Sequence, residues 1–278
     1  SESLSGHVPL IIPGLLNTDR FEVQHDSIAM QVDRDISLIL DRSGSMGWVD
    51  FEWEYGEDPF STDAKDWAVE QGQLNRWWND GWRYSYANGH DSTTYQQYMY
   101  ENYFDKGVPP TSAWQDLVVA VNAFLDVLDD TSQEEQVSLA SYSSSATLDT
   151  LLESDLSIVR NKVEQLNTGG RTGIGSGMLE GIEGLVHSRA RPFAAKTMVV
   201  MTDGIQNREP WAQPIAQGLM DAHLLTIHTV TFGEGANQTD MQEVAAIGGG
   251  KHFHAATGED LIRIFREIAN NLPTILTK

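Results

Sequence analysis

Two hydrophobic periods alternate along most of the chain. Short, nearly continuous apolar runs, typical of strands covered on both faces, are separated by longer segments whose apolar residues recur every three or four positions. The runs predict strands over 36–41, 136–142, 146–151, 196–201, 224–232 and 250–255. The longer segments predict helices over 113–129, 156–166, 173–186, 211–222, 240–247 and 258–272. This alternation predicts an α/β fold, a doubly wound, mainly parallel open sheet with helices on both faces.

Two of the expected helices carry a clear apolar stripe. Over 113–129 the stripe consists of Leu117, Val121, Phe124, Leu125 and Leu128. Over 258–272 it consists of Leu261, Ile264, Phe265 and Ile268. Such spacing places each set on one helical face, so both helices are expected to pack against the sheet.

The hydrophobic pattern also divides the chain. We expect an irregular N-terminal arm over 1–35, with strands near 21–25 and 27–32, and an α/β domain over 36–272. A short tail, 273–278, follows. Between 48 and 110 the alternation stops, and we interpret this segment as an insertion within the α/β domain.

The insertion holds most of the large aromatic residues, including six of the eight Trp and seven of the eight Tyr. One helix is expected over 62–78, beginning after Ser61, and the remainder is rich in turn residues. Such a composition supports a small core of its own, a recognition surface, or both. A calcium site built from Asp50, Glu52, Glu54 and Asp58 is a further alternative.

Composition and charge exclude some classes of function and of binding site. The 278 residues carry 40 acids and 18 bases, a net charge of −22, which argues against binding nucleic acid through its phosphates or docking on anionic lipid. The chain has no cysteine, so disulfides and thiolate metal sites are excluded. No apolar stretch approaches the roughly 20 residues of a membrane span, so we expect no direct membrane insertion by this fragment.

The candidate chemistry lies where the expected strands end. Asp41, Ser43 and Ser45 follow the strand over 36–41, Thr172 lies in a glycine-rich loop before a helix, and Asp203 ends the strand over 196–201. Carboxylates and hydroxyls are hard oxygen ligands, which suit Mg²⁺, Mn²⁺ or Ca²⁺ and suit Zn²⁺ poorly. Two charges and three neutral hydroxyls leave a divalent cation electrophilic, with a position open for an outside oxygen.

In this order and spacing, the three segments resemble the metal-ion-dependent adhesion site (MIDAS) of von Willebrand factor A (VWA) domains. The resemblance implies one divalent cation, Mg²⁺ first and Ca²⁺ or Mn²⁺ second. Ser43 and Ser45 would bind it directly, Asp41 and Asp203 through water, and Thr172 directly or through water. The open position would take an Asp or Glu of a protein ligand, so the resemblance implies a binding module and not an enzyme.

The resemblance covers residues 34–47 and 111–272. Three residues beside the expected cation, Arg171, Gly44 and Trp48, are candidate contacts for the ligand. Arg171 is a departure, because the family often has a small or polar residue beside the loop threonine. Its cation would leave the metal ligands intact and alter which ligands bind.

A narrower resemblance lies over 29–46, with the sequence AMQVDRDISLILDRSGSM. This stretch is similar to the A domain of TadG-like proteins, bacterial envelope proteins linked to tight-adherence (Flp) pilus assembly. The similarity implies an extracytoplasmic location in the cell envelope or at the cell surface. It also implies a full-length protein with a membrane anchor outside this fragment, serving pilus assembly or adhesion.

Several alternatives remain open for the site. Asp41 and its serines also suit a capped turn, and an aspartyl-phosphate phosphotransferase also places Asp after its first strand, although it prefers a second acid where Ser43 stands. A metal-dependent phosphoester hydrolase and a domain with a purely stabilising metal are the other functional alternatives.

Two further motifs are weaker. His252 and His254 lie on one strand face, as a zinc pair would, but no third ligand is evident, so an ordinary strand pair is the simpler interpretation. The loop over 169–173 lacks the Gly-Lys-Ser/Thr ending of a nucleotide-binding loop.

Overall fold

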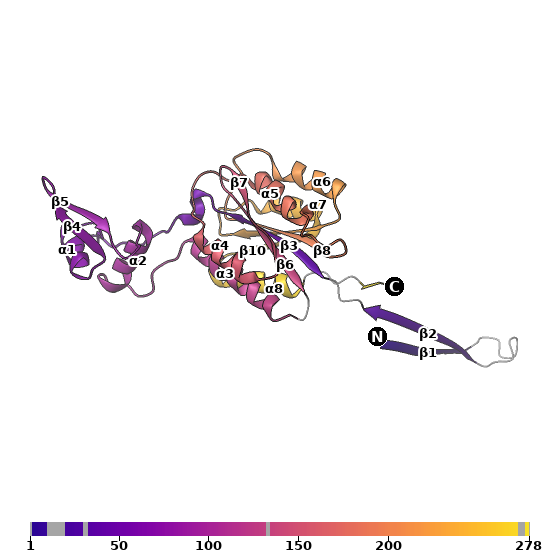
Figure 1. Cartoon of the computed structure of the whole chain (residues 1–278). Helices are drawn as coiled ribbons and strands as arrows, with labels where there is room; N and C mark the ends of the chain where they lie inside the picture. Colours follow the sequence, from indigo (N-terminus) through magenta and orange to yellow (C-terminus); the bar gives the residue numbers. More distant parts are fainter. Residues whose placement is uncertain (1, 10–19, 30–32, 132–133, 272–275, 278) are drawn as a thin grey trace.

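The centre of the molecule is a six-stranded sheet (Figure 1) in the order β10-β9-β8-β3-β6-β7. The computed structural model describes residues 2–9, 20–29, 33–131, 134–271 and 276–277. The sheet consists of β3 (Arg34–Asp41), β6 (Glu135–Tyr142), β7 (Ala146–Glu153), β8 (Ala195–Thr202), β9 (Thr226–Phe232) and β10 (Gly249–Ala255). All neighbours pair in parallel except β7, which runs antiparallel to β6. The expected mainly parallel α/β sheet is therefore confirmed.

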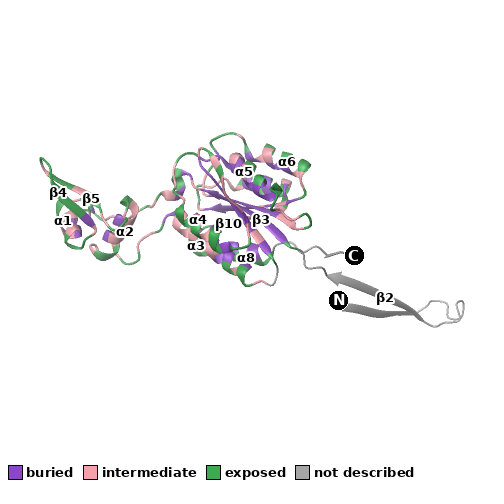
Figure 2. Ribbon diagram, in the orientation of Figure 1, coloured by how far each residue is buried: buried purple, intermediate pink, exposed green. Residues whose placement is uncertain are grey.

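Helices cover both faces of this sheet. One layer consists of α3 (Ala113–Asp129), α4 (Leu156–Gln165) and α8 (Gly258–Asn270), and the other of α5 (Ile174–Val186), α6 (Ala212–Ala222) and α7 (Gln238–Ile247). Figure 2 shows the buried residues concentrated between the helices and the sheet. Leu38 and Leu40 of β3 face the first layer and Ile39 the second, so β3 is buried on both faces. This double burial explains its nearly continuous apolar sequence.

The apolar stripes predicted for the helices over 113–129 and 258–272 are buried. They meet between α3 and α8, where the rings of Phe124 and Phe265 pack edge to face with centroids 6.1 Å apart.

Helix α5 approaches the sheet closely because it presents glycines to it. A Cβ at Gly177 would collide with the ring of Tyr142, and one at Gly181 with the side chain of Ile39. Since α5 begins at Ile174, this tight packing also fixes the loop that precedes it, which carries Thr172.

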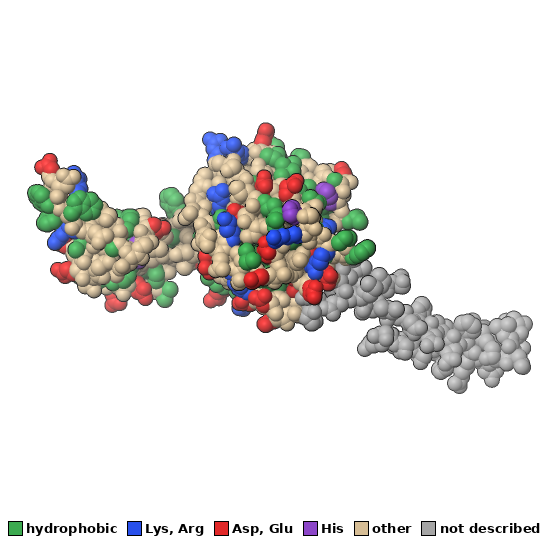
Figure 3. All heavy atoms as spheres, in the orientation of Figure 1, with side chains coloured by type: hydrophobic (Ala, Val, Ile, Leu, Met, Phe, Trp, Pro, Cys, Tyr) green, Lys and Arg blue, Asp and Glu red, His purple; other side chains and the backbone are tan. Residues whose placement is uncertain are grey.

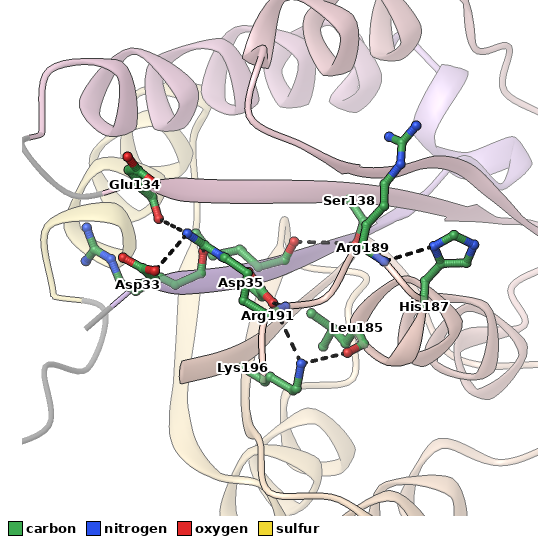
Figure 4. Close-up of polar contacts among 11 residues, drawn as sticks. Asp33, Asp35, Glu134, Ser138, Leu185, His187, Arg189, Arg191 and Lys196 are labelled. Atoms are coloured by element: carbon green, nitrogen blue, oxygen red, sulfur yellow. Dashed lines mark hydrogen bonds and ion pairs between the residues drawn. The ribbon is translucent and has the colours of Figure 1, made fainter. Parts of the chain in front are cut away.

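A buried ionic cluster lies at the end of the sheet where β3 begins (Figure 4). Asp35 is fully buried. Its carboxylate accepts bonds from the main-chain N–H of Arg191 at 2.8 Å and from the Arg191 Nε at 2.9 Å, with the Lys196 Nζ at 3.7 Å. The Arg191 guanidinium also donates to the carbonyls of Arg34 and Glu134, both at 2.8 Å. This cluster ties the segment before β8 to the start of β3.

The N-terminal region forms a hairpin. Strand β1 (Glu2–Pro9) pairs antiparallel with β2 (Arg20–Ala29), which also pairs with the short β11 (Leu276–Thr277) in the C-terminal segment. The strand near 21–25 and the beginning of the one near 27–32 lie within β2, whereas residues 30–32 lie outside the described residues. Strand β1 was not anticipated by the sequence pattern.

The insertion contains α1 (Thr62–Glu70), β4 (Leu74–Trp78), β5 (Trp82–Tyr86) and α2 (Ser92–Asn102). The helix predicted over 62–78 is therefore wrong in its second half. The chain leaves the helix after Glu70 because Gly72 adopts a φ of +71°, and the following Trp-rich residues pair with β5. The beginning of the helix is correct, with Ser61 capping it through a bond from the Ala64 N–H.

Helix α2 was not predicted, although Asp91 and Thr94 form a capping box at its start. Its fully buried Tyr95 and Met99 pack with Leu74 and with residues of α1 in a small hydrophobic cluster confined to the insertion. The Tyr95 hydroxyl donates to the carbonyl of Pro59 at 2.8 Å. The insertion thus has a core of its own.

Replacing residues 48–110 with a short Gly/Ser linker should leave the α/β domain folded. The reason is that the insertion's hydrophobic cluster is separate from the two clusters of the sheet. The short helix η1 (Gly44–Gly47), which precedes the insertion, also contacts α3, which follows it. Circular dichroism during thermal unfolding should show one cooperative transition, and loss of cooperativity would mean that the insertion completes the main core.

Candidate metal centre

Asp41 ends β3 and is fully buried at the carboxyl edge of the sheet. One carboxylate oxygen accepts a bond from the Ser43 main-chain N–H, and the other accepts one from the Thr202 hydroxyl, both at 2.8 Å. Because β3 and β8 are parallel neighbours, Thr202 at the end of β8 lies directly beside Asp41. Each oxygen of Asp41 therefore has one donor, and the carboxylate is held in a fixed orientation.

A chain of hydroxyls connects this buried acid to the surface. The Ser43 and Ser45 Oγ atoms are 3.1 Å apart, and the Ser45 hydroxyl donates to Asp203 Oδ1 at 2.8 Å. Ser43 is buried, Asp203 is half-buried and Ser45 is exposed. The site therefore opens to solvent on the side of Ser45.

The loop that carries Thr172 is attached to the Asp41 loop by main-chain bonds. The Gly44 N–H donates to the Gly170 carbonyl at 3.0 Å, and the Gly169 N–H to the Arg42 carbonyl at 2.8 Å. Gly169 and Gly170 both adopt positive φ angles, +150° and +88°, which explains why glycine occupies this loop.

Thr172 lies near the same centre. Its Oγ1 is 3.8 Å, and the Ser45 Oγ 3.7 Å, from the point where a Cβ at Gly204 would stand. The two hydroxyls thus flank Gly204, which follows Asp203. The structure brings all five predicted oxygen-bearing residues to one edge of the sheet, three of them in a continuous hydrogen-bonded chain.

Two residues that sequence analysis missed hold this arrangement together. Thr202 bonds Asp41, and Asn207 bonds the main chain of Thr172 in both directions, with its Oδ1 accepting and its N–H donating at 3.0 Å. Thr202 had a weak signal, because it is a hydroxyl at the carboxyl end of a core strand, the edge of the sheet where Asp41 was also expected. Asn207 had none, because its contact depends on how the loop folds.

The pKa values of the two carboxyl groups are raised. Burial, with a smaller contribution from the nearby Asp203 charge, raises the pKa of Asp41 to about 6, although the hydrogen bonds from Ser43 and Thr202 oppose the shift. Burial likewise raises the pKa of Asp203, opposed by the Ser45 hydroxyl. Two neighbouring acids with raised pKa values form a site in which a cation relieves unfavourable burial and repulsion.

The donor set fits a hard divalent cation. Neither carboxylate forms an ion pair with a described Lys, Arg or His. Among the described residues, no group of three or more His, Cys, Asp or Glu is placed to hold a metal ion. A metal here would therefore depend on hydroxyl oxygens, which favours Mg²⁺ or Ca²⁺ over softer metals.

The candidate ligand contacts lie in the loops that carry the metal-binding candidates. Arg171 is exposed, and its main-chain N–H donates to the Ser144 Oγ at 2.9 Å. Gly44 is exposed and bonds the neighbouring loop. Trp48 is 76% exposed and its N–H donates to the Ser45 carbonyl at 3.0 Å. Their roles in ligand binding stay predictions.

The histidines have hydrogen-bonding partners within the sheet. His252 lies 2.9 Å from the Thr229 Oγ1 through its Nδ1, and His254 lies 3.0 Å from the Thr231 Oγ1. These contacts favour the interpretation of an ordinary strand pair over that of a zinc site.

The stability that Asp41 contributes to the metal-free protein should fall as the pH rises from about 4 to about 6. Asp41 has a pKa near 3.8 when unfolded and about 6 when folded, so the folded state gains from its protonation. This gain is complete below the unfolded pKa and is lost as the pH rises through about 6. Two pKa units correspond to about 3 kcal/mol. Denaturant unfolding of wild type and Asp41→Asn should isolate this effect, because the other acids are common to both.

Protonation of the same group should oppose cation binding. Magnesium affinity should fall by up to about tenfold for each pH unit below about 6, because a proton and the cation compete for one carboxylate. Titration calorimetry at several pH values measures this directly. An affinity that does not change between pH 5 and pH 7 would place the cation away from Asp41.

Comparison with known proteins identifies the family to which this fold belongs. A model of the von Willebrand factor type A domain family matches residues 110–267, which include Thr172 and Asp203 but not the Asp41 loop. No curated protein sequence matches the chain.

Solved structures share the fold at low sequence identity. A von Willebrand factor type A protein from Catenulispora acidiphila is 15% identical with a TM-score of 0.55, covering 86% of this chain and 42% of that one. The PilB minor pilin from Streptococcus sanguinis (D319A mutant) is 14% identical with a TM-score of 0.54, covering 94% and 66%. Proximal thread matrix protein 1 from the mussel byssus, with a zinc-occupied MIDAS motif, is 14% identical with a TM-score of 0.52, covering 88% and 47%.

This chain thus spans less than half the length of the Catenulispora and mussel proteins. The strand order, the helices on both faces and the family match over more than half of the residues agree with one another. The chain belongs to the von Willebrand factor type A domain family.

Proposed function

We propose that this chain is a metal-dependent protein-binding module. Asp41, Ser43, Ser45, Thr172 and Asp203 would hold one divalent cation, and the cation would bind an Asp or Glu side chain of a partner protein. The observation that carries the proposal is the hydrogen-bonded chain from Ser43 through Ser45 to Asp203, beside the buried Asp41. The proposal includes no catalytic step.

Magnesium is the cation that this donor set suits best. Mg²⁺ keeps several waters and binds few protein oxygens directly, which fits a site where Asp41 already accepts two hydrogen bonds. Ca²⁺ and Mn²⁺ are the other candidates. The mussel protein holds zinc in its MIDAS motif, so the family fold also accommodates other divalent ions.

We further propose that the module acts in the bacterial cell envelope, in adhesion or Flp/Tad pilus assembly. Support comes from the similarity of residues 29–46 to TadG-like proteins and from the fold shared with a minor pilin. Among the described residues, no helix is long and apolar enough to cross a membrane.

The proposal is tested by selecting ligands in the presence of magnesium. A random peptide library displayed on phage is bound to the full chain in Mg²⁺ and eluted with EDTA. We expect the eluted peptides to contain Asp or Glu, and we expect Asp203→Ala to capture none of them. The proposal fails if the eluted peptides lack carboxylates or bind the variant equally well.

Two alternatives give different results. A phosphoester hydrolase would turn over a generic phosphoester and lose this activity in Asp41→Asn. A purely stabilising metal would lower the melting temperature strongly on chelation but would give no EDTA-dependent peptide capture.

A further inference from the structure

We propose a second binding site, on the insertion, at which an extended acidic segment of a partner protein adds a strand to the free edge of β5. The site is separate from the candidate metal centre and requires no cation.

Within the described residues, the outer edge of β5 pairs with no other strand. Strands β4 and β5 form a two-stranded antiparallel sheet in which Trp77 faces Arg83 and Asn75 faces Ser85. The Ala87 N–H donates to the Gln73 carbonyl at 3.0 Å, which places the odd-numbered residues at the hydrogen-bonded positions. By the alternation of an antiparallel ladder, the even-numbered residues of β5 direct their N–H and C=O groups away from β4.

These outward groups belong to Trp82, Tyr84 and Tyr86. None of them receives a main-chain hydrogen bond from elsewhere in the part of the chain that the structure describes. A row of unpaired groups along an exposed strand is a template for another extended chain, the mode of recognition known as β-augmentation.

A groove runs along this edge. Its volume is about 370 Å³, and its walls include every residue from Trp82 to Tyr86 together with the rings of Phe60 and Tyr95. The groove also touches Leu74 of β4, the cross-strand partner of Tyr86, so it lies partly over that face of the hairpin and extends along the whole of β5. It therefore borders the strand whose outward main-chain groups are unpaired among the described residues.

Exposed aromatic side chains surround the groove. Trp82 is 51% exposed and packs edge to face on Trp78, which is 67% exposed. Figure 3, in the orientation of Figure 1, shows hydrophobic side chains gathered at the end of the insertion that carries β4 and β5. Exposed Trp and Tyr beside a groove supply most of the affinity at many protein interfaces.

The charge of the groove determines what kind of segment fits. Its walls carry Lys65 and Arg83 and no acidic residue, in a chain with a net charge of −22. The Lys65 Nζ lies 5.0 Å from the centre of the Tyr84 ring, and Arg83 forms no ion pair with the described residues. A basic groove favours acidic segments. A second copy of this chain is disfavoured because two such acidic molecules repel each other.

A peptide uses these features better than a glycan does. Outward N–H and C=O groups repeat at every second residue of β5, which matches the spacing of an extended main chain. A sugar would stack on the aromatic rings but would not pair with the repeating main-chain N–H and C=O groups of β5.

The test selects peptides that bind without metal. The random phage library is bound to the full chain in EDTA, which leaves the metal centre empty. We expect enrichment of peptides that alternate β-branched or aromatic residues with Asp or Glu. The charge reversal Lys65→Glu/Arg83→Glu should weaken a selected peptide about tenfold, because attraction becomes repulsion at two exposed positions. Asp203→Ala and the exposed control Lys251→Glu should bind it as the wild type does.

Hydrogen exchange locates the bound peptide. The amides of Trp82, Tyr84 and Tyr86 should gain protection on binding, whereas those of Arg83 and Ser85, already bonded to β4, should change little. Failure to enrich any EDTA-resistant peptide overturns the proposal, as does unchanged affinity in the charge-reversed variant or protection without this alternation. A sugar that binds on a glycan array and competes with the peptide would also overturn the proposal, because the groove would then hold a glycan. None of these outcomes bears on the proposal for the metal centre.

Discussion

Asp203→Ala should abolish the stabilisation that Mg²⁺ gives to the folded protein. A ligand that binds only the native state stabilises it by about 2.7 kcal/mol at a concentration 100 times its Kd. Asp203 supplies one of the two negative charges of the site and accepts the bond that fixes the Ser45 hydroxyl. Its removal leaves one buried acid and neutral hydroxyls, which attract a divalent ion weakly. Thermal unfolding with and without Mg²⁺ measures the change.

A matched control separates this result from a general loss of negative charge. Asp116 is half-buried like Asp203, but it bonds Thr111 at the start of α3. Asp116→Ala should therefore keep the full response to Mg²⁺, and Asp41→Asn should lose it as Asp203→Ala does. If both site variants respond to Mg²⁺ as the wild type does, the cation binds elsewhere.

Arg191→Leu should destabilise the protein by about 3–5 kcal/mol, the usual cost of removing one partner of a buried ion pair. The fully buried Asp35 would lose its Nε partner and keep only the Arg191 main-chain N–H and the more distant Lys196. The carbonyls of Arg34 and Glu134 would also lose a donor. Urea unfolding measures the difference in the free energy of unfolding.

The control for this prediction is an exposed pair. Arg263, 63% exposed, bonds Asp260 on α8, so Arg263→Leu should cost less than about 1 kcal/mol. Asp35→Asn combined with Arg191→Leu should recover part of the lost stability, because the uncompensated charge is then absent. Equal costs for Arg191→Leu and Arg263→Leu would contradict the importance assigned to the buried cluster.

The α/β body and its strand ends were predictable because their signals are local. Each core strand is a short apolar run, and parallel strands bring their carboxyl ends to one edge, so Asp41 and Asp203 were expected at the same edge of the sheet. The grouping of these two residues with Thr172 in one site came from the resemblance of the three segments to a metal-ion-dependent adhesion site. The contact of Asn207 with that loop was not predictable, because it depends on the path of the chain after β8 and not on any periodicity.

The insertion was harder to interpret. Residues 62–78 suit a helix in their first half, and the run from Leu74 to Trp78 has no period strong enough to separate helix from strand. In the structure, the positive φ of Gly72 ends the helix before Leu74. In the sequence, an isolated glycine is compatible with a helix that continues and with one that ends. In the N-terminal arm, the pairing of β11 with β2 joins the two ends of the chain, and no local pattern specifies such a contact.

The most direct test of the metal centre is an anomalous difference map from crystals grown with Mn²⁺, used in place of Mg²⁺ because it scatters anomalously. A single peak is expected at the carboxyl edge of the sheet, within about 2.6 Å of both the Ser43 and Ser45 hydroxyl oxygens, the upper range for direct oxygen ligands. Asp203 should lie next to it, directly or through one water. A map with its peak elsewhere, and with the Ser45 hydroxyl still donating to Asp203, would contradict the account.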